Sequence, residues 1–334
     1  MKKVFEGEVF EDCPDEWEKR IDNSFWLKPD ILEASKYRDT SFRYVVHKKY
    51  ICCEYTKKIN LFTFGKFKLN IPITFIALPF SIDQPGFYGD VNEIIEDYKK
   101  RKGFFLLLNL KDVNSINKKY PTGYTLWTCI FENRFESFDH YILSIRSNYR
   151  RRIAIAQKKG SCLIVRKINC KDYDDRLHKL YLNVLDNSQY PIERLKKEFF
   201  QTVDIDIYVF YKDEIPVAFI STKMVKNTLH FIFGGMDYRL RDQFDLYYNM
   251  LLEIVKLGIS LKCKKINFGQ TGEISKSRIG CIFEKRYMVG FSSNTFLNTI
   301  VKCLKPFIEY KKPRVNHKVF KDLRQKGDME KFYE

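Results

Sequence analysis

The sequence lacks the features that mark an extracellular protein or a structural metal site. Its nine cysteines are scattered and odd in number, and no C-x-x-C pair occurs. This pattern favours reduced thiols over disulfides or a zinc site. No apolar run reaches the length of about 18 residues that a membrane span needs, and the N-terminal stretch has no apolar signal core. We therefore expect a soluble, cytoplasmic protein with no metal and no tightly bound cofactor.

Several catalytic motifs are also missing. There is no G-x-S-x-G, no P-loop, no Rossmann fingerprint and no H-E-x-x-H. The five histidines are isolated and do not have metal-ligand spacing. The sequence thus gives no support for a serine hydrolase, a P-loop nucleotidase, a dinucleotide-dependent oxidoreductase or a zinc protease.

The bulk composition describes a folded, basic protein. The 334 residues are enough for two domains, and hydrophobic residues make up 45% of them, which argues against disorder. The formal net charge is +17. Such a surface attracts polyanions: nucleic acid, anionic lipid, a phosphate-rich cosubstrate or an acidic carrier protein.

Strand and helix patterns alternate along the chain, which predicts an α/β fold. Strand patterns occupy residues 41–78, 104–110, 124–132 and 161–168. Helical patterns occupy residues 91–103, 138–160, 173–186 and 192–203. Residues 138–160 read as one long helix with a basic rim.

Residues 204–286 form the most informative stretch. Turns at Asp213-Glu214 and Lys226-Asn227 separate runs of strand-forming residues, and a long amphipathic helix, LYYNMLLEIVKLGISLKC, follows. This order can splay a sheet and leave a slot, which we expect near Phe231 and Phe268. A thioester arm entering the slot would find exposed strand backbone for hydrogen bonding.

The link between strand and helix, GGMDYRLRDQFDLYYN, is a second candidate binding element. A helix start near residues 242–245 would offer N–H groups to a pyrophosphate or a carboxylate. The alternative is that Asp242 or Asp245 caps the helix and the arginines are solvated. The link lacks the glycine-rich pyrophosphate loop of ordinary acetyl-CoA users. Its candidate ligand-binding residues, together with Phe231, are Gly234, Gly235, Arg239, Arg241 and Gln243.

A polar corner ends the next strand, in INFGQTGEISKSRIGC. Gln270 and Glu273 are the candidate catalytic residues, because Glu273 is suited to accept a proton from an attacking amine. Lys276 and Arg278 are candidates for holding a carboxylate or phosphate. The alternative is that Thr271 caps a helix, with Glu273 in its first turn and salt bridges on the remaining charges.

The basic segments allow two interpretations. The stripe from Arg146 to Lys159 and the basic tail after residue 295 can bind phosphate groups or a lipid surface. In TFLNTIVKCLKPFI, apolar residues share one helical face, as in helices that lie on membranes. The alternative is that this face docks on its own domain.

Two of these segments resemble a known family. YILSIRSNYRRRIAIAQKKGSCLIVRKI is similar to the basic helix-to-strand transition that opens the second domain of FemAB-like proteins in the GNAT superfamily. DLYYNMLLEIVKLGISLKCKKINFGQTGEISKSRIGC resembles the helix, strand and corner of their acyltransferase-like members. The resemblance covers roughly residues 125–290. It reaches the first half only as an expectation of a second, degenerate GNAT-like unit.

The resemblance implies two GNAT-like lobes, each a mixed, mostly antiparallel sheet flanked by helices, followed by a basic helical tail. We place these parts at residues 1–145, 146–295 and 296–334. It also implies transfer of an acyl or aminoacyl group to an amine, and it does not indicate the donor. We expect acyl-CoA or an acyl-carrier phosphopantetheine as cosubstrate. The alternatives are a FemX-like transferase that uses aminoacyl-tRNA, and a non-catalytic protein that binds nucleic acid or lipid. The proton-accepting role of Glu273 rests on its place in the corner and not on the resemblance.

Overall fold

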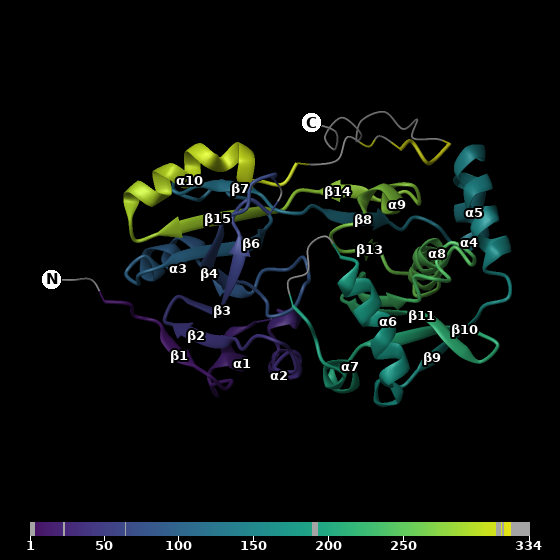
Figure 1. The fold of residues 1–334 in the computed structure, drawn as a ribbon, viewed down its shortest axis with the longest axis horizontal. Helices are drawn as coiled ribbons and strands as arrows, with labels where there is room; N and C mark the ends of the chain where they lie inside the picture. Colours follow the sequence, from purple (N-terminus) through teal and green to yellow (C-terminus); the bar gives the residue numbers. More distant parts are fainter. Residues whose placement is uncertain are drawn as a thin grey trace. The chain divides into compact units, whose positions relative to one another are not determined.

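The computed structural model describes residues 4–22, 24–63, 65–188, 193–311, 315 and 317–321 (Figure 1). The chain divides into two compact units, each built around one sheet. Unit 1 comprises Met1–Thr128, Ser188–Asp204 and Lys285–Lys312, and unit 2 comprises Cys129–Asn187, Ile205–Glu284 and Pro313–Glu334. The predicted α/β class with two mixed, mostly antiparallel sheets is confirmed.

Unit 1 has a sheet of strand order β1-β2-β3-β4-β6-β15-β7, with β5 paired to β3. Its strands are β1 (Glu8–Phe10), β2 (Arg43–His47), β3 (Tyr50–Asn60), β4 (Asn70–Ile76), β5 (Phe87–Gly89), β6 (Phe104–Leu110), β7 (Thr122–Tyr124) and β15 (Tyr287–Ser292). Its helices are α1 (Trp17–Arg20), η1 (Phe25–Leu27), α2 (Pro29–Ala34), α3 (Val91–Tyr98), α7 (Lys197–Thr202) and α10 (Thr295–Ile308). Asp90 caps α3, and the buried face of this helix, Ile94, Ile95 and Tyr98, joins the core against Phe105 and Leu107.

Unit 2 has a sheet of strand order β14-β8-β13-β12-β11-β10-β9. Its strands are β8 (Thr128–Glu132), β9 (Ile164–Ile168), β10 (Asp206–Lys212), β11 (Ile215–Val225), β12 (Thr228–Met236), β13 (Lys265–Asn267) and β14 (Ile282–Glu284). Its helices are α4 (Phe138–Ser144), α5 (Ser147–Lys159), η2 (Cys170–Asp172), α6 (Asp175–Asp186), α8 (Leu246–Ser260) and α9 (Glu273–Ser277). The predicted turn at Asp213 and Glu214 is confirmed, and both residues have the positive φ of a tight hairpin turn.

The division into units does not follow the boundaries that we placed at residues 145 and 295. Strand β8 pairs with β13 and so carries the chain into unit 2 from residue 129. Strand β15 pairs with β6 and β7 and returns the chain to unit 1 before residue 295. Hydrogen bonds between distant strands decide where each unit begins, and these leave no local change in composition.

The predicted single helix over residues 138–160 is wrong, because it is broken into α4 and α5. Ile145 and Arg146 have extended backbone, and Ile145 forms a β-bridge with Phe320. Arg146 also donates from its backbone N–H to the Val319 carbonyl at 2.9 Å. A segment from the far end of the chain therefore interrupts a pattern that is helical on both sides.

The predicted basic tail begins as a helix. Helix α10 packs on β15 and β7 in unit 1 (Figure 1). Asn294 caps it, with its side chain accepting from the Phe296 and Leu297 amides. Residues 322–334, the end of the predicted tail, lie outside the described part of the chain.

Each sheet contains a parallel pair whose strands are joined through a helix and whose pairing covers only three residues. In unit 1, β4 pairs with β6 only over Thr74–Ile76. The loop that follows β4 fills the space beyond. Asn109 on β6 donates from its amide to the carbonyls of Ile82 and Gln84, and Asp83 is buried against Arg286. In unit 1 the loop after β4 therefore fills the gap between β4 and β6.

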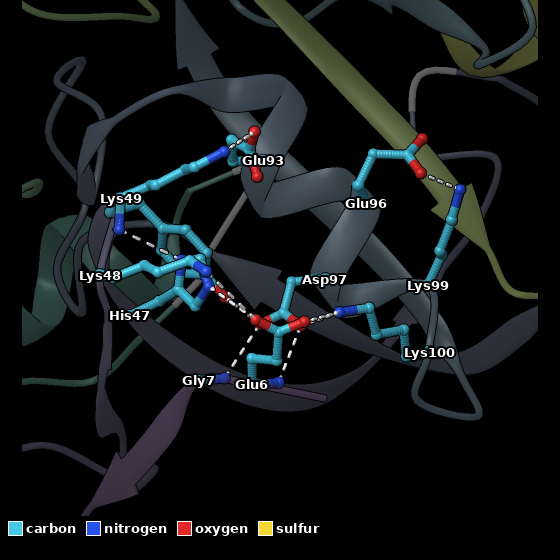
Figure 2. A network of polar contacts seen from close by, with 11 residues as sticks. Glu6, Gly7, His47, Lys48, Lys49, Glu93, Glu96, Asp97, Lys99 and Lys100 are labelled. Atoms are coloured by element: carbon cyan, nitrogen blue, oxygen red, sulfur yellow. Dashed lines mark hydrogen bonds and ion pairs between the residues drawn. The ribbon is translucent and has the colours of Figure 1, made fainter. Parts of the chain in front are cut away.

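A buried carboxylate ties the start of the chain to unit 1 (Figure 2). Asp97 on α3 is 3% exposed and accepts from the backbone N–H groups of Glu6 and Gly7 at 2.8 and 3.0 Å. It also accepts from the Tyr50 hydroxyl at 2.7 Å and from the Lys100 ammonium at 3.1 Å. Four donors on one buried carboxylate make it a structural anchor.

We predict that Asp97→Ala lowers the free energy of unfolding by about 3 kcal/mol, because it leaves buried donors without their acceptor. The matched control is Glu93→Ala on the same helix, which removes a more exposed ion pair with Lys49 and should cost less than about 0.5 kcal/mol. Urea unfolding measures both values, and hydrogen exchange at the Glu6 and Gly7 amides reports the local release. Equal stability of the two variants would contradict the anchoring role.

Candidate active site

The parallel pair of unit 2 opens where the slot was predicted. Strand β12 pairs with β13 only over Thr228–His230, opposite Lys265–Asn267, yet β12 continues to Met236. Beyond Asn267 the chain stays hydrogen-bonded to β8 instead: Phe268 N–H donates to the Cys129 carbonyl, and Cys129 N–H donates to the Gly269 carbonyl, each at 2.9 Å. The two strands therefore separate after three paired residues.

A β-bulge bends β12 at the same level. Its partner β11 pairs Ser221 with Phe233 and Thr222 with Phe231, so Ile232 is the extra residue. The Ser221 hydroxyl oxygen lies 3.0 Å from both the N and the O of Phe233 and stabilises the bulge. Bulges increase the local twist and turn a strand away from its neighbour, so this one helps to hold the split open.

Phe231 and Gly269 face each other across the opening. A β-carbon built on Gly269 would lie 3.9 Å from the Phe231 carbonyl oxygen and would meet no other heavy atom within 4 Å. Gly269 has a φ of +68°, which a residue with a side chain rarely adopts. The opening thus has free space beside a backbone carbonyl.

A buried lysine holds the polar corner together. Lys276 is 2% exposed, and its ammonium group donates to the carbonyls of Phe268 at 2.7 Å and Gln270 at 2.8 Å. Thr271 and Gly272 next to them have φ values of 61° and 64°. These carbonyls point into the interior and would otherwise be costly to bury. Lys276 therefore stabilises the corner, whereas we had expected it to contact a ligand.

Glu273 and Tyr247 meet at this corner. Glu273 is the first residue of α9, directly after Gly272. Tyr247, in the first turn of α8, brings its hydroxyl so close that a β-carbon on Gly272 would lie 2.4 Å from the oxygen. Burial raises the pKa of Tyr247, and nearby groups that include Glu273 raise this pKa further. A protonated hydroxyl and a partly exposed glutamate thus lie at the corner that follows β13 in the chain.

Two charged side chains of the protein itself lie at the N-terminus of α8. The helix begins at Leu246, and Asp245 precedes it with a left-handed φ of 51°. Arg152 from α5 donates to both carboxylate oxygens of Asp245 and lies over the Tyr248 ring, 4.2 Å from its centroid. Asp245 gives no side-chain cap to the helix. An aspartate–arginine pair therefore stands at the helix start where we had expected an external anion.

The other predicted ligand residues of the link are exposed. Arg239 pairs with Asp237, and Arg241 pairs with Asp242. Each arginine lowers the pKa of its aspartate through a hydrogen bond and charge. Gln243 and Arg278 are also exposed. These positive charges are largely balanced by their neighbours, and their proposed contacts with a ligand stay predictions.

The paired glycines serve helix packing. A β-carbon on Gly235 would lie 2.6 Å from the backbone of Leu180 and Tyr181 in α6. A β-carbon on Gly234 would lie 2.8 Å from the Met250 side chain in α8. The absence of side chains here lets helices approach both faces of β12, so the space is filled by the protein itself.

Of the predicted site, the structure places the Phe231 carbonyl beside Gly269, the residue before Gln270 in the chain. It adds residues that sequence reasoning missed: Tyr247, Ser221 and Asn267, whose side-chain oxygen accepts from the Gly269 N–H at 2.8 Å. The position of Tyr247 in the first turn after the charged link was a usable signal. Ser221 and Asn267 lie inside ordinary strand patterns and gave none.

No protein-family model matches this sequence, and neither does any curated protein sequence. Solved structures do share its fold. The crystal structure of FemX matches with a TM-score of 0.50 at 11% identity, over 88% of this chain and 100% of that chain. The C-terminal domain of a putative lysylphosphatidylglycerol synthetase from Agrobacterium fabrum matches with a TM-score of 0.53 at 9% identity, over 87% and 96%. L-PGS from Bacillus licheniformis matches with a TM-score of 0.51 at 10% identity, over 90% and 99%.

These likenesses confirm the expected fold, two α/β lobes like those of FemX and the two lysylphosphatidylglycerol synthetase structures. At such low identity they show the fold alone. Function has to be argued from the site itself.

We predict that Lys276→Met lowers the free energy of unfolding by about 2–4 kcal/mol, because two buried carbonyls lose their donor. Lys264→Met, an exposed lysine one residue before β13, is the matched control and should change stability by less than about 0.5 kcal/mol. Urea unfolding of both variants gives the comparison. A Lys276→Met protein as stable as the control would refute the bracing role of this ammonium group.

Proposed function

We propose that this chain is an enzyme that transfers an acyl group from an activated carbonyl to an amine. The observation that carries the proposal is the separation of β12 from β13 after His230 and Asn267, followed in the chain by the corner that holds Glu273 and Tyr247. A split strand pair gives an extended donor arm backbone groups to bind. In this proposal the Glu273 carboxylate accepts a proton from the amine and the Tyr247 phenol donates a hydrogen bond to the leaving group.

The reaction is a direct substitution. The amine nitrogen attacks the donor carbonyl carbon, a C–N bond forms, and the C–S or C–O bond to the leaving group breaks. Glu273 accepts the proton that the amine loses, directly or through water. Tyr247, whose pKa is raised by burial, stays protonated near neutral pH and is suited to donate a hydrogen bond to the leaving sulfur or oxygen. The departing thiolate or alkoxide takes its proton from water. Backbone N–H groups of β12 stabilise the negative charge on the carbonyl oxygen.

A thioester is the first candidate donor, either acyl-CoA or an acyl-carrier phosphopantetheine. Its arm is narrow and extended and suits a slot between two strands. The Asp245–Arg152 pair at the start of α8 and the absence of a glycine-rich loop both weaken the usual grip on a pyrophosphate. A carrier-bound phosphopantetheine avoids that requirement.

Aminoacyl-tRNA is the second candidate donor, and the net charge of +17 favours it. Helix α5 contributes to a basic surface, since Arg151 and Lys158 are exposed and Arg150 is partly exposed. Such surfaces bind phosphate backbones with a strong dependence on salt. A protein that binds one of these donors without turnover would be the third, non-catalytic alternative.

We expect a donor screen to separate these cases. The full chain is incubated with acetyl-CoA, a long-chain acyl-CoA, an acylated carrier protein and aminoacyl-tRNA, with hydroxylamine as a general amine acceptor. Mass spectrometry then detects the hydroxamate and the released carrier, and product counts only in excess of a blank without the protein, because hydroxylamine also cleaves these donors uncatalysed. Product from a thioester supports the first donor, and product from tRNA supports the second. Donor binding without product supports the non-catalytic alternative, and neither binding nor product with any donor would overturn the proposal.

We predict that Glu273→Gln lowers kcat/KM with the active donor by about 100-fold, because the general base is lost. The loss should appear in kcat with KM little changed, since the proton is transferred in the chemical step. Glu214→Gln, an exposed carboxylate paired with Arg166 in the β10–β11 turn, is the matched control and should retain full activity. An unchanged kcat in Glu273→Gln would assign the proton transfer to another group.

A further inference from the structure

Unit 1 exposes apolar side chains on two neighbouring elements. In the tip of the β3–β4 hairpin, Phe67 is 62% exposed and Leu69 is also exposed. On α10, Phe296 is 71% and Phe307 is 53% exposed, and Ile300 lies between them on the same helical face. Large side chains at such exposure are costly in water unless another phase or molecule covers them.

The two elements lie side by side. A β-carbon on Gly65 in the hairpin tip would lie 3.0 Å from the Phe307 carbonyl oxygen at the end of α10. The Phe62 and Phe67 rings contact each other edge to face, with centroids 5.7 Å apart. The hairpin tip and the helix therefore form one surface, which we call the hairpin–helix surface.

Positive charge accompanies this apolar surface, and negative charge is absent from its two segments. Residues 57–69 contain four lysines and no acidic residue, and one of these lysines, Lys57, pairs with Asp39 at 3.4 Å. Residues 295–308 contain Lys302 and Lys305 and no acidic residue, and the first carboxylate after the helix, Glu309, lies 3.8 Å from Lys305. Lys58, Lys66, Lys68 and Lys302 are exposed. Protein interfaces are depleted in lysine, whereas surfaces that bind anionic lipid combine apolar side chains with lysines.

We propose that the hairpin–helix surface binds the face of an anionic phospholipid bilayer. The phenylalanines and Ile300 enter the boundary between headgroups and acyl chains, and the lysines contact the anionic headgroups. No helix in the described part of the chain is both long and apolar enough to cross a bilayer. This proposal concerns unit 1 alone and does not depend on the transfer reaction proposed for unit 2.

Vesicle co-sedimentation of the full chain tests the proposal. We expect at least about tenfold stronger binding to phosphatidylcholine vesicles that contain 30% phosphatidylglycerol than to phosphatidylcholine alone, because several lysines meet anionic headgroups. Binding should fall as salt rises from 50 to 500 mM, since salt screens those contacts. The double variant Phe67→Ser/Phe296→Ser should lose about tenfold on the anionic vesicles, and Lys66→Glu/Lys68→Glu should lose a similar factor.

Ile215→Ser in the β10–β11 turn is the matched control, because Ile215 is an apolar residue of unit 2 that is 65% exposed. It should bind vesicles like the unchanged protein. Equal binding of the Phe67→Ser/Phe296→Ser variant and the control would overturn the proposal, and so would no preference for anionic vesicles. Sedimentation velocity without lipid tests the alternative that a second copy of the chain binds this surface. A dimer that becomes monomeric in Phe67→Ser/Phe296→Ser would overturn the membrane proposal in favour of that alternative. Because the test contains no donor, its failure leaves the acyl-transfer proposal unaffected.

Discussion

The site of unit 2 depends on one constraint, the loss of pairing between β12 and β13 after three residues. Backbone groups that leave a sheet must find other partners or remain accessible to water or a ligand. On the β13 side, β8 takes over the hydrogen bonds of Phe268 and Gly269. On the β12 side, the Ser221 hydroxyl stabilises the bulge at Ile232. Both strands are thus held apart by fixed contacts, and the opening is part of the fold.

Unit 1 also contains a parallel strand pair with short pairing, but there a loop fills the gap. There β4 and β6 also part after three residues, but the loop that follows β4 enters the space and bonds to Asn109. The Asp83–Arg286 ion pair buries the loop further. The two lobes therefore share a plan, and what fills the split distinguishes them. This contrast supports placing the proposed chemistry in unit 2.

Two basic regions of the protein differ in how far acidic side chains balance their positive charges. In the link before α8, aspartates accompany Arg152, Arg239 and Arg241, so little net charge is left for a phosphate. In the hairpin–helix surface, two of the six lysines have carboxylate neighbours, Asp39 beside Lys57 and Glu309 beside Lys305, and the other four are exposed. A net charge of +17 by itself does not show this difference. This difference between the two regions is why we propose that the strand opening binds a donor arm and that the lysine-rich apolar surface binds a membrane.

The sequence by itself determined the features that short segments encode: the α/β class, the β10–β11–β12 hairpins with their turn at Asp213, and the polar corner after Phe268. Alternation, helical spacing and turn residues act within a few positions, so they can be read locally. Only the tertiary structure decided the break at Ile145, which needs Phe320, and the pair of Arg152 with Asp245. It also decided that Lys276 turns inward and that Tyr247 reaches Gly272. These contacts join elements that are distant in the chain or depend on how helices pack, and neither spacing nor composition records them.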